Sequence, residues 1–321
     1  MATYKGIQGY TVQKLSNDPT ASDAEGQLWY NSTVGKWRLA SAGSGAWASS
    51  GALNTGRTEL SGMGTQTAAL AAAGDTGSIS DKAETYDGST WTEVNAINTA
   101  RDQVASSGTT TSGLIFGGTP PTSGLAITES YDGSTWTEVA DLTTARRSLA
   151  GAGASNTAAL AFSGYNTANL ALTESWNGTS WTEVADLNTV RRAGIGGGTS
   201  TSALMVAGYA AGDIDNVESW NGTSWTEVND LNTAGAGMGA GIPDSTSGLV
   251  FGGDRPGAIG LTESYDGSSW TEVGDLATVR AYLGGAGSNT AAVGFGGSPG
   301  YTTATEEWAD PVYTAKTVTV S

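Results

Sequence analysis

The chain has 321 residues, among them 48 Gly and 11 Trp but no Cys or His, and its formal net charge is -17 at pH 7. Without Cys and His, disulfides, Ser-His-Asp triads and the usual zinc and copper sites are excluded, so a bound metal would need oxygen ligands, as calcium does. The negative charge argues against binding of a nucleic-acid backbone, and no apolar run is long enough to insert in a membrane.

Residues 1–45 form a leader that lies outside the repeats of the remaining chain. The polar segment Ser16–Asp23 is typical of a linker, and Leu28–Tyr30 and Lys36–Leu39 are predicted as the strands of a hairpin. Because a two-stranded hairpin is marginal alone, we expect it to dock on the main domain, on a second chain or on an assembly. The anchoring residues would be Leu28, Trp29, Tyr30 and Trp37.

From residue 46 onward the sequence repeats with a period of 44 or 45 residues. Such a period predicts an array of units that bury their apolar faces against one another. The most regular marker is a Trp that we expect to be structural, filling the gap between neighbouring units. It occurs at Trp47, Trp91, Trp136, Trp181, Trp225 and Trp270.

One repeat shows how each unit is built. Its four predicted strands are near Asp102–Thr109, Gly113–Gly117, Ala126–Tyr131 and Trp136–Val139. Four antiparallel strands per period predict the blade of a β-propeller, with the small residues of the first strand nearest the axis. The third and fourth strands are joined by Asp-Gly or Asn-Gly in five repeats, which predicts type I′ turns with positive φ at both central residues.

The ends of the repeat array set the number of blades. The third-strand pattern Glu-x-(Tyr/Trp) occurs six times, and no fourth-strand Trp follows Trp308. Trp47 is followed six residues later by Leu53, as Trp136 is by Leu142. We therefore predict an all-β, six-bladed propeller that is closed by the Trp47 strand as the outer strand of the last blade.

Three parts of the chain follow from this count: the leader 1–45, a propeller 46–308 and an extended tail 309–321. Thr314–Ser321 alternates like a strand and is predicted to pair with the leader hairpin or with a neighbouring subunit. The sequence leaves open whether the protein is a homo-oligomer.

Each complete blade carries one Glu on its third strand and, apart from the fifth blade, one Arg before its first strand. Because these residues recur in nearly every blade, we interpret them as scaffold rather than as a ring of ligand-binding groups. Gly235 stands at the Arg position of the fifth blade. The repeated arginines are Arg57, Arg101, Arg146, Arg191 and Arg280.

The two faces of the predicted ring differ. Loops between the first and second strands are nearly uniform and share one face with the Asp-Gly turns, whereas loops between the second and third strands all differ. Variable loops on a rigid scaffold are a usual place for binding, although such loops also tolerate sequence change for no functional reason. Aromatic and carboxylate groups suit saccharides, so the candidate ligand-binding residues are Tyr165, Tyr209, Asp213, Asp215, Asp254, Arg255 and Tyr301.

The Gly pair that ends the second strand, followed by an aromatic residue and then by Trp, resembles the kelch repeat over roughly residues 46–308. The pair is Gly117-Gly118 in one blade, and its first Gly is replaced in three others, as in Ala73-Gly74. In the kelch family the Gly, Tyr and Trp positions are structural, so this resemblance implies a fold and no particular chemistry.

A second resemblance concerns context. The leader motif Gly26–Arg38 is similar to a short segment of bacteriophage tail-fibre and other virion proteins, and blades such as Glu174–Arg192 resemble proteins of phages that infect marine bacteria. These resemblances imply a virion protein, assembled in the host cytoplasm, whose leader binds other virion proteins and whose propeller contacts a host surface glycan or protein.

We expect no enzymatic activity and no cofactor. A galactose-oxidase-like activity would need His-ligated copper and a Cys-linked Tyr, and a glycosidase would need two non-repeated carboxylates in one pocket. The prediction is a tail-fibre or adhesin component. The alternatives are a decoration protein that binds only virion proteins and a glycan-binding lectin.

Overall fold

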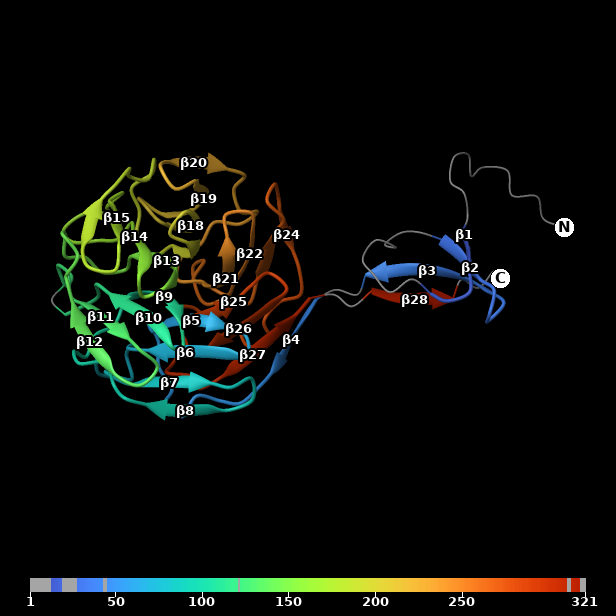
Figure 1. Cartoon of the computed structure of the whole chain (residues 1–321), viewed down its shortest axis with the longest axis horizontal. Coiled ribbons are helices and arrows are strands. Elements are labelled where there is room, and N and C mark those ends of the chain that lie inside the picture. Colours follow the sequence, from blue (N-terminus) through green and yellow to red (C-terminus); the bar gives the residue numbers. More distant parts are fainter. Residues whose placement is uncertain (1–12, 19–27, 43–44, 121, 311–312, 318–321) are drawn as a thin grey trace. The chain divides into compact units, whose positions relative to one another are not determined.

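The computed structural model describes residues 13–18, 28–42, 45–120, 122–310 and 313–317. The described residues form only β-strands, in seven sheets of four strands each. They contain no helix that is long and apolar enough to cross a membrane. The chain divides into two compact units, residues 46–309 and residues 1–45 with 310–321 (Figure 1).

The smaller unit contains one sheet in the order β1-β2-β3-β28. β2 (Leu28–Asn31) and β3 (Lys36–Ala42) form the predicted hairpin. β28 (Tyr313–Thr317) pairs antiparallel with β3, so of the two predicted partners of the tail the structure shows the leader hairpin. β1 (Gln13–Leu15), which runs parallel to β2, was not predicted. Of the predicted linker Ser16–Asp23, the part after Asp18 lies outside the described residues.

The anchoring residues differ in their surroundings within this sheet. Trp29 is buried at 2% exposure, and its Nε1 donates a hydrogen bond to Asp18 Oδ1 at 3.1 Å. Trp37 is 42% exposed and packs edge-to-face with Tyr30, and Leu28 is 37% exposed. Trp29 therefore stabilises the sheet itself, whereas Trp37 and Leu28 are accessible on its surface.

The larger unit contains the other six sheets, which surround a common centre with their first strands innermost (Figure 1). The sheets share one antiparallel strand plan. Their strands are β5–β8 (Ser61–Thr65, Ala68–Ala72, Ala83–Tyr86, Trp91–Val94), β9–β12 (Ala105–Thr109, Ser112–Phe116, Thr128–Tyr131, Trp136–Val139), β13–β16 (Ala150–Ser155, Ala158–Phe162, Thr173–Trp176, Trp181–Glu183), β17–β20 (Ile195–Thr199, Ser202–Tyr209, Asp213–Trp220, Trp225–Val228), β21–β24 (Gly239–Asp244, Ser247–Phe251, Thr262–Tyr265, Trp270–Glu272) and β25–β27 (Gly284–Gly287, Ala291–Phe295, Thr305–Ala309) with β4 (Ala46–Ser49).

The last sheet joins the two ends of the repeat array. β4 pairs antiparallel with β27, and Trp47 lies opposite Trp308. The structure thus contains seven four-stranded sheets where six were predicted. The additional sheet is that of the leader and tail, which the count missed because it carries no repeat sequence.

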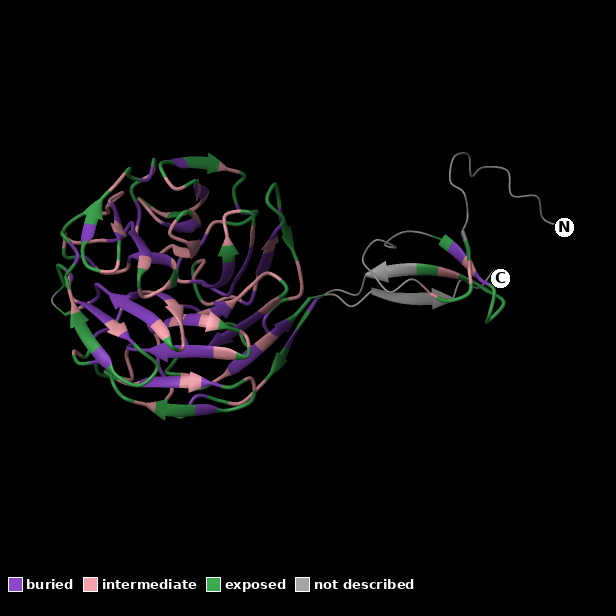
Figure 2. Cartoon of the chain, in the orientation of Figure 1, coloured by how far each residue is buried: buried purple, intermediate pink, exposed green. Residues whose placement is uncertain are grey.

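Small residues in the first strands let the sheets approach closely at the centre. A Cβ placed on Gly62 in β5 would come within 2.4 Å of the Gly285 carbonyl oxygen in β25, so this contact requires glycine. Buried residues are concentrated in the second and third strands, such as β10 and β11, while outer strands such as β12 and β20 are largely exposed (Figure 2).

The repeated Trp residues fill the space between sheets, as predicted. Trp181 in β16 packs edge-to-face on Phe116 in β10 of the preceding sheet, with ring centroids 5.0 Å apart. Its Nε1 donates to Thr128 Oγ1 of that sheet at 3.1 Å. Trp91 makes the equivalent contact with Phe295, which belongs to the sheet at the other end of the array.

The repeated Arg and Glu residues are buried ion pairs, which confirms their interpretation as scaffold. The Arg101 guanidinium lies 3.0 Å from the Glu129 carboxylate, and both side chains are fully buried. Glu129 also accepts hydrogen bonds from the backbone N–H and side-chain amide of Asn98, at 2.7 and 2.8 Å. Because Asn98 follows the outer strand of the preceding sheet, each Glu ties two neighbouring sheets together.

The Asp-Gly connections differ from the predicted type I′ turns. In each of them only the glycine has positive φ, for example 96° at Gly133. Asp132 Oδ1 accepts hydrogen bonds from the N–H groups of Ser134 and Thr135, at 2.8 and 2.7 Å. The carboxylate therefore organises a four-residue loop, and Asp132 itself has no need of the left-handed conformation.

Candidate functional site

The two ends of the larger unit present different surfaces. We call the end with the loops between first and second strands and the Asp/Asn-Gly turns the turn face, and the end with the loops between second and third strands the loop face. The turn-face loops lie side by side: a Cβ on Gly133 would be 3.3 Å from Thr111. On this face the same residue types recur in sheet after sheet.

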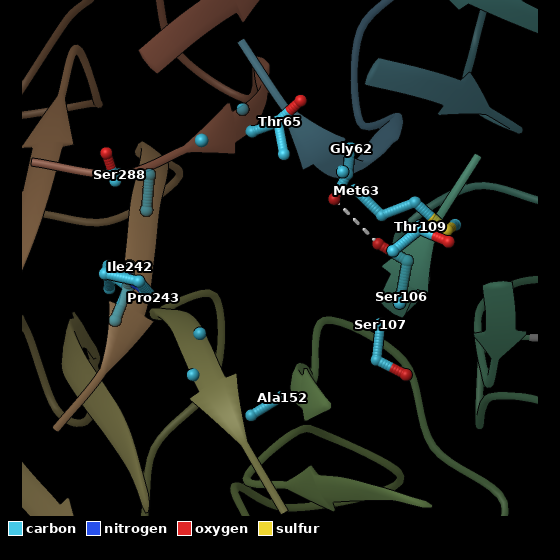
Figure 3. Close-up of a pocket in the computed structure, with 18 of the residues that line it drawn as sticks. Gly62, Met63, Thr65, Ser106, Ser107, Thr109, Ala152, Ile242, Pro243 and Ser288 are labelled. Atoms are coloured by element: carbon cyan, nitrogen blue, oxygen red, sulfur yellow. Dashed lines mark hydrogen bonds between the residues drawn. The ribbon is translucent and has the colours of Figure 1, made fainter. Parts of the chain in front are cut away.

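A cavity of about 510 Å³ lies at the centre near the turn face. Residues from all six first strands surround it, including Thr65, Ser107 and Ala152, and Ser288 follows the sixth of these strands (Figure 3). Ser106 Oγ donates a hydrogen bond to the Gly62 carbonyl oxygen at 2.9 Å across two adjacent strands (Figure 3). Among the residues that the structure describes, no charged side chain lines this cavity, so its lining offers few groups that could recognise a ligand.

At the loop-face end, the residue two positions before each first strand has a left-handed backbone. Its φ lies between 51° and 61° in all six sheets. The N–H of each of these residues donates to the carbonyl oxygen of its counterpart in the preceding sheet, at 2.6–3.1 Å, and the series returns to its starting residue. The six residues are Glu59, Gln103, Ser148, Ala193, Gly237 and Tyr282.

These six residues line a second cavity of about 240 Å³, which we call the mouth. The backbone is the same at each position while the side chain is different every time, and a left-handed bulky residue such as Tyr282 is unusual. Non-repeated side chains on a strained, repeated backbone are typical of a functional site. Arg147 and Arg192 line the same cavity.

Gln103 connects several polar groups of the mouth. Its Oε1 accepts hydrogen bonds from Arg147 Nη1 at 2.5 Å and from Ser148 Oγ at 2.7 Å, and its Nε2 donates to Glu59 Oε2 at 3.0 Å. These contacts join three neighbouring sheets and fix the side chains at one side of the mouth.

Two tyrosines and two arginines alternate beside these groups. The guanidinium carbons of Arg147 and Arg192 each lie 4.9 Å from the centroid of the Tyr165 ring. The Arg192 carbon also lies 4.7 Å from the centroid of the Tyr209 ring. Cation–π contacts at such distances hold both arginines in place and leave the tyrosine rings occupied.

Acidic groups lie around other parts of the mouth. Burial, together with the charges of Glu59 and Asp75, raises the pKa of Asp102 to about 7. The Tyr282 hydroxyl donates to Asp254 Oδ2 at 3.4 Å, and burial and this carboxylate raise the pKa of Tyr282. Burial and then Asp254 also raise the pKa of Asp213. The loop face is thus cationic on one side and anionic on the other.

Arg255, which was predicted to bind a ligand, forms a buried ion pair instead. Its side chain is 8% exposed and reaches within 4.0 Å of the Glu263 carboxylate. A Cβ on Gly235 would be 2.5 Å from Arg255 Nε, so Arg255 occupies the space left by the missing repeated arginine. The fifth sheet therefore keeps its Arg–Glu pair, supplied from a loop.

None of the seven candidate residues chosen from the sequence lines the mouth, and some of them contact residues that do. Tyr165 and Tyr209 hold its arginines, Asp254 contacts Tyr282, and Asp213 lies near Asp254. Tyr301 is 50% exposed beside Gly77, and Asp215 lies within β19. The sequence analysis missed Glu59, Gln103, Arg147, Ser148, Arg192 and Tyr282.

A signal for two of the missed residues was present. The repeated arginine is followed by a second arginine in two repeats only, at Arg147 and Arg192. Among the described residues, no three acidic side chains converge on a point where they could hold a metal ion. The sequence predicts no cofactor and leaves a structural calcium as an alternative, and within the described residues no acidic cluster offers a site for that ion.

The chain matches no protein-family model and no curated protein. Among solved structures it is similar to the structure of YjhT, which has a β-propeller-like fold. The TM-score is 0.66, the sequence identity is 13%, and the match covers 83% of this chain and 99% of YjhT. At this identity the likeness supports a propeller-like fold and carries no function.

Proposed function

We propose that this protein is a non-enzymatic virion component, a tail-fibre or adhesin protein whose loop face contacts the host surface. The observation that carries the proposal is the mouth, where six equivalent backbone positions are occupied by six different residue types around one cavity. Side chains that the fold requires recur from sheet to sheet, as on the turn face, whereas these six positions are not held to one residue and are available for binding.

The proposed scaffold is a closed six-bladed propeller related to kelch repeats. Support comes from the pairing of β4 with β27 and from the hydrogen-bond series at the mouth, which runs through all six sheets and back to its start. Closure leaves no long sheet edge exposed and fixes the mouth residues relative to one another.

The leader and tail are proposed to attach the protein to other virion proteins. The resemblance of Gly26–Arg38 to phage virion segments supports this role. The small sheet also exposes Leu28, Val34, Trp37 and Leu39, with exposures of 36–48%. Exposed apolar side chains of this size on one small sheet are typical of an interaction surface.

A non-enzymatic role is supported by the lining of the mouth. Glycoside hydrolysis requires two carboxyl groups on either side of the scissile bond. Among the described residues, Glu59 is the one carboxylate that lines the mouth. Its neighbours Gln103, Arg147 and Ser148 bind and orient rather than transfer protons at neutral pH.

The absence of native cysteine allows a direct test on the full chain. Ala168→Cys on the loop face, Thr111→Cys on the turn face and Val34→Cys in the leader place single thiols at exposed positions. Each variant is coupled to a polyethylene glycol maleimide. Binding is then measured to host bacterial cells and to virions that lack this protein.

We expect the loop-face label to abolish cell binding and the turn-face label to leave it intact. The leader label should abolish attachment to virions and leave cell binding intact. Cell binding that survives the loop-face label would overturn the proposal. Binding to virions but never to cells would make the protein a decoration protein.

A further inference from the structure

The arginines and lysines of residues 46–309 are nearly all used in ion pairs. Nine occur in this range, and seven of them have a carboxylate within 4.0 Å. Within the described residues, Arg147 and Arg192 have no carboxylate at that distance. In a chain with a net charge of -17, two adjacent cations without an acidic partner require an explanation.

Uncharged groups hold these two arginines. Arg147 Nε donates to the Thr122 carbonyl oxygen at 2.8 Å, and its Nη1 donates to Gln103 Oε1. Arg192 Nη1 donates to Asn169 Oδ1 at 2.9 Å. Each guanidinium has five N–H donors, so both keep donors that these contacts leave unused.

The two positive charges are also close together. Both guanidinium carbons lie 4.9 Å from the Tyr165 ring centroid, so they are within about 10 Å of each other. Both arginines contact the Tyr165 ring, and an anion that contacted both guanidinium groups would offset their mutual repulsion. The planar fork of arginine fits carboxylate and phosphate oxygens in a bidentate manner.

The remainder of the mouth supplies hydrogen-bonding groups. The polar residues Gln103, Ser148 and Glu59 line the same cavity as the two arginines. Its volume of about 240 Å³ is below the range of pockets for drug-sized ligands and suits one sugar-sized group. Such a set recognises a small ligand with one anionic group and several hydroxyl groups.

We propose that the mouth binds an acidic saccharide, with its anionic group at Arg147 and Arg192 and its hydroxyl groups at Gln103, Ser148 and Glu59. This inference rests on the proposed binding function and specifies its ligand class. Because the net charge of the protein repels anions at long range, recognition depends on these local contacts. Glu59 sets the orientation, since it repels the acid and accepts from a hydroxyl.

The test uses the full chain and three probes: galactose, galacturonate and galactose 6-phosphate. Galacturonate differs from galactose by a carboxylate in place of the terminal hydroxymethyl group, and the third probe carries a phosphate there. Affinities are measured by calorimetry at low and high salt. We expect one or both acids to bind at least about tenfold more tightly than galactose, with the difference shrinking at high salt.

The variants Arg147→Ala and Arg192→Ala should each lower the affinity for the acid about tenfold more than the affinity for galactose. Arg192→Lys should retain part of the affinity because the charge remains while the fork is lost. Lys82→Ala, which removes a cation paired with Glu93 away from the mouth, is the matched control and should change nothing. Thermal unfolding midpoints confirm that the variants are folded.

Equal affinity for the three sugars, or no binding of either acid, would overturn the acidic-saccharide assignment. The proposed adhesin function would still stand if the loop-face label abolished cell binding. Conversely, the protein could bind galacturonate or galactose 6-phosphate through both arginines and yet not attach to cells. That result would support the ligand site and contradict the adhesin function.

Discussion

Two Arg-Arg pairs in the sequence place neighbouring residues in opposite environments. Arg146 is fully buried against Glu174 at 3.1 Å, while Arg147 lines the mouth without a carboxylate partner among the described residues. Arg191 and Arg192 repeat the contrast. The first residue of each pair occupies a position that is Arg in five of six repeats. The following position varies from sheet to sheet: Thr58, Asp102, Arg147, Arg192, Ala236 and Ala281.

Within each repeat, a residue required by the fold can thus stand directly beside a residue that is available for binding. A side chain required by the fold recurs, because each sheet must satisfy the same contacts with its neighbours. A side chain that makes none of these contacts can differ from one sheet to the next. Substitutions on either side of this boundary should therefore behave differently.

The largest difference is expected between Arg146→Ala and Arg147→Ala. Removing Arg146 leaves the Glu174 carboxylate buried without its cation, which should lower the free energy of unfolding by about 3–5 kcal/mol. Removing Arg147, which is half-buried and has uncharged partners, should cost less than about 1 kcal/mol. Urea denaturation of the two variants measures both values.

The matched pair Arg191→Ala and Arg192→Ala serves as an independent replicate in the next sheet. If Arg147→Ala and Arg192→Ala destabilised the protein as much as their neighbours, the mouth arginines would belong to the scaffold. The contrast between repeated and non-repeated positions would then be wrong.

Arg255 sharpens the comparison because it is a non-repeated residue in a repeated role. Arg255→Ala should lower the free energy of unfolding by about 2 kcal/mol, less than Arg146→Ala because its distance to Glu263 is 4.0 Å. The double variant Gly235→Arg/Arg255→Ala restores the repeat arginine and should recover part of the loss. If the double variant were no more stable than Arg255→Ala, Arg255 would not be replacing the arginine that is missing at position 235. Urea denaturation gives both comparisons.

Asp102 occupies the same variable position as Arg147 and should respond to pH. Its pKa of about 7 in the folded state exceeds the value near 4 of an unfolded chain, so the folded state holds the proton more tightly. Stability from this group is present below about pH 4 and is lost as the pH rises to 7. Asp102→Asn should therefore raise the free energy of unfolding at pH 8 by about 1–3 kcal/mol.

The measurement is urea denaturation of both proteins between pH 4 and 8. The two stability curves should diverge as the pH rises, with the wild-type curve falling. Parallel curves would show that Asp102 is ionised throughout and that its carboxylate has a partner.

The sequence predicted the scaffold well because each scaffold feature is repeated. Four strands per period, the Trp between sheets and the Arg–Glu pairs each appear at least five times, so chance matches are easily excluded. The turn type was wrong because Asp-Gly is compatible with two connections. The choice depends on whether the Asp132 carboxylate accepts N–H groups from its own loop, which spacing alone does not reveal.

The mouth could not be predicted in the same way. Its residues are separated by about one repeat length in sequence, and each differs from its counterparts, so they resemble tolerated variation. They come together because the first strands surround one centre. Arg255 was misassigned for a related reason, since its loop position does not show that Gly235 leaves a space for it.

The smallest effect is expected at a repeated position on the turn face, Asp132→Asn. Asn177 already accepts N–H groups from Thr179 and Ser180 in the equivalent loop, at 2.9 and 3.0 Å, so the amide can replace the carboxylate. The thermal unfolding midpoint at pH 7 should be unchanged. Four hydrogen bonds from Ser134 and Thr135 lower the pKa of Asp132, so this carboxylate contributes stability above about pH 4 that is lost in stronger acid. Between pH 7 and pH 3 the thermal unfolding midpoint of the variant should therefore fall by less than that of the wild type. A variant midpoint below the wild-type value at pH 7 would mean that the turn requires the charge.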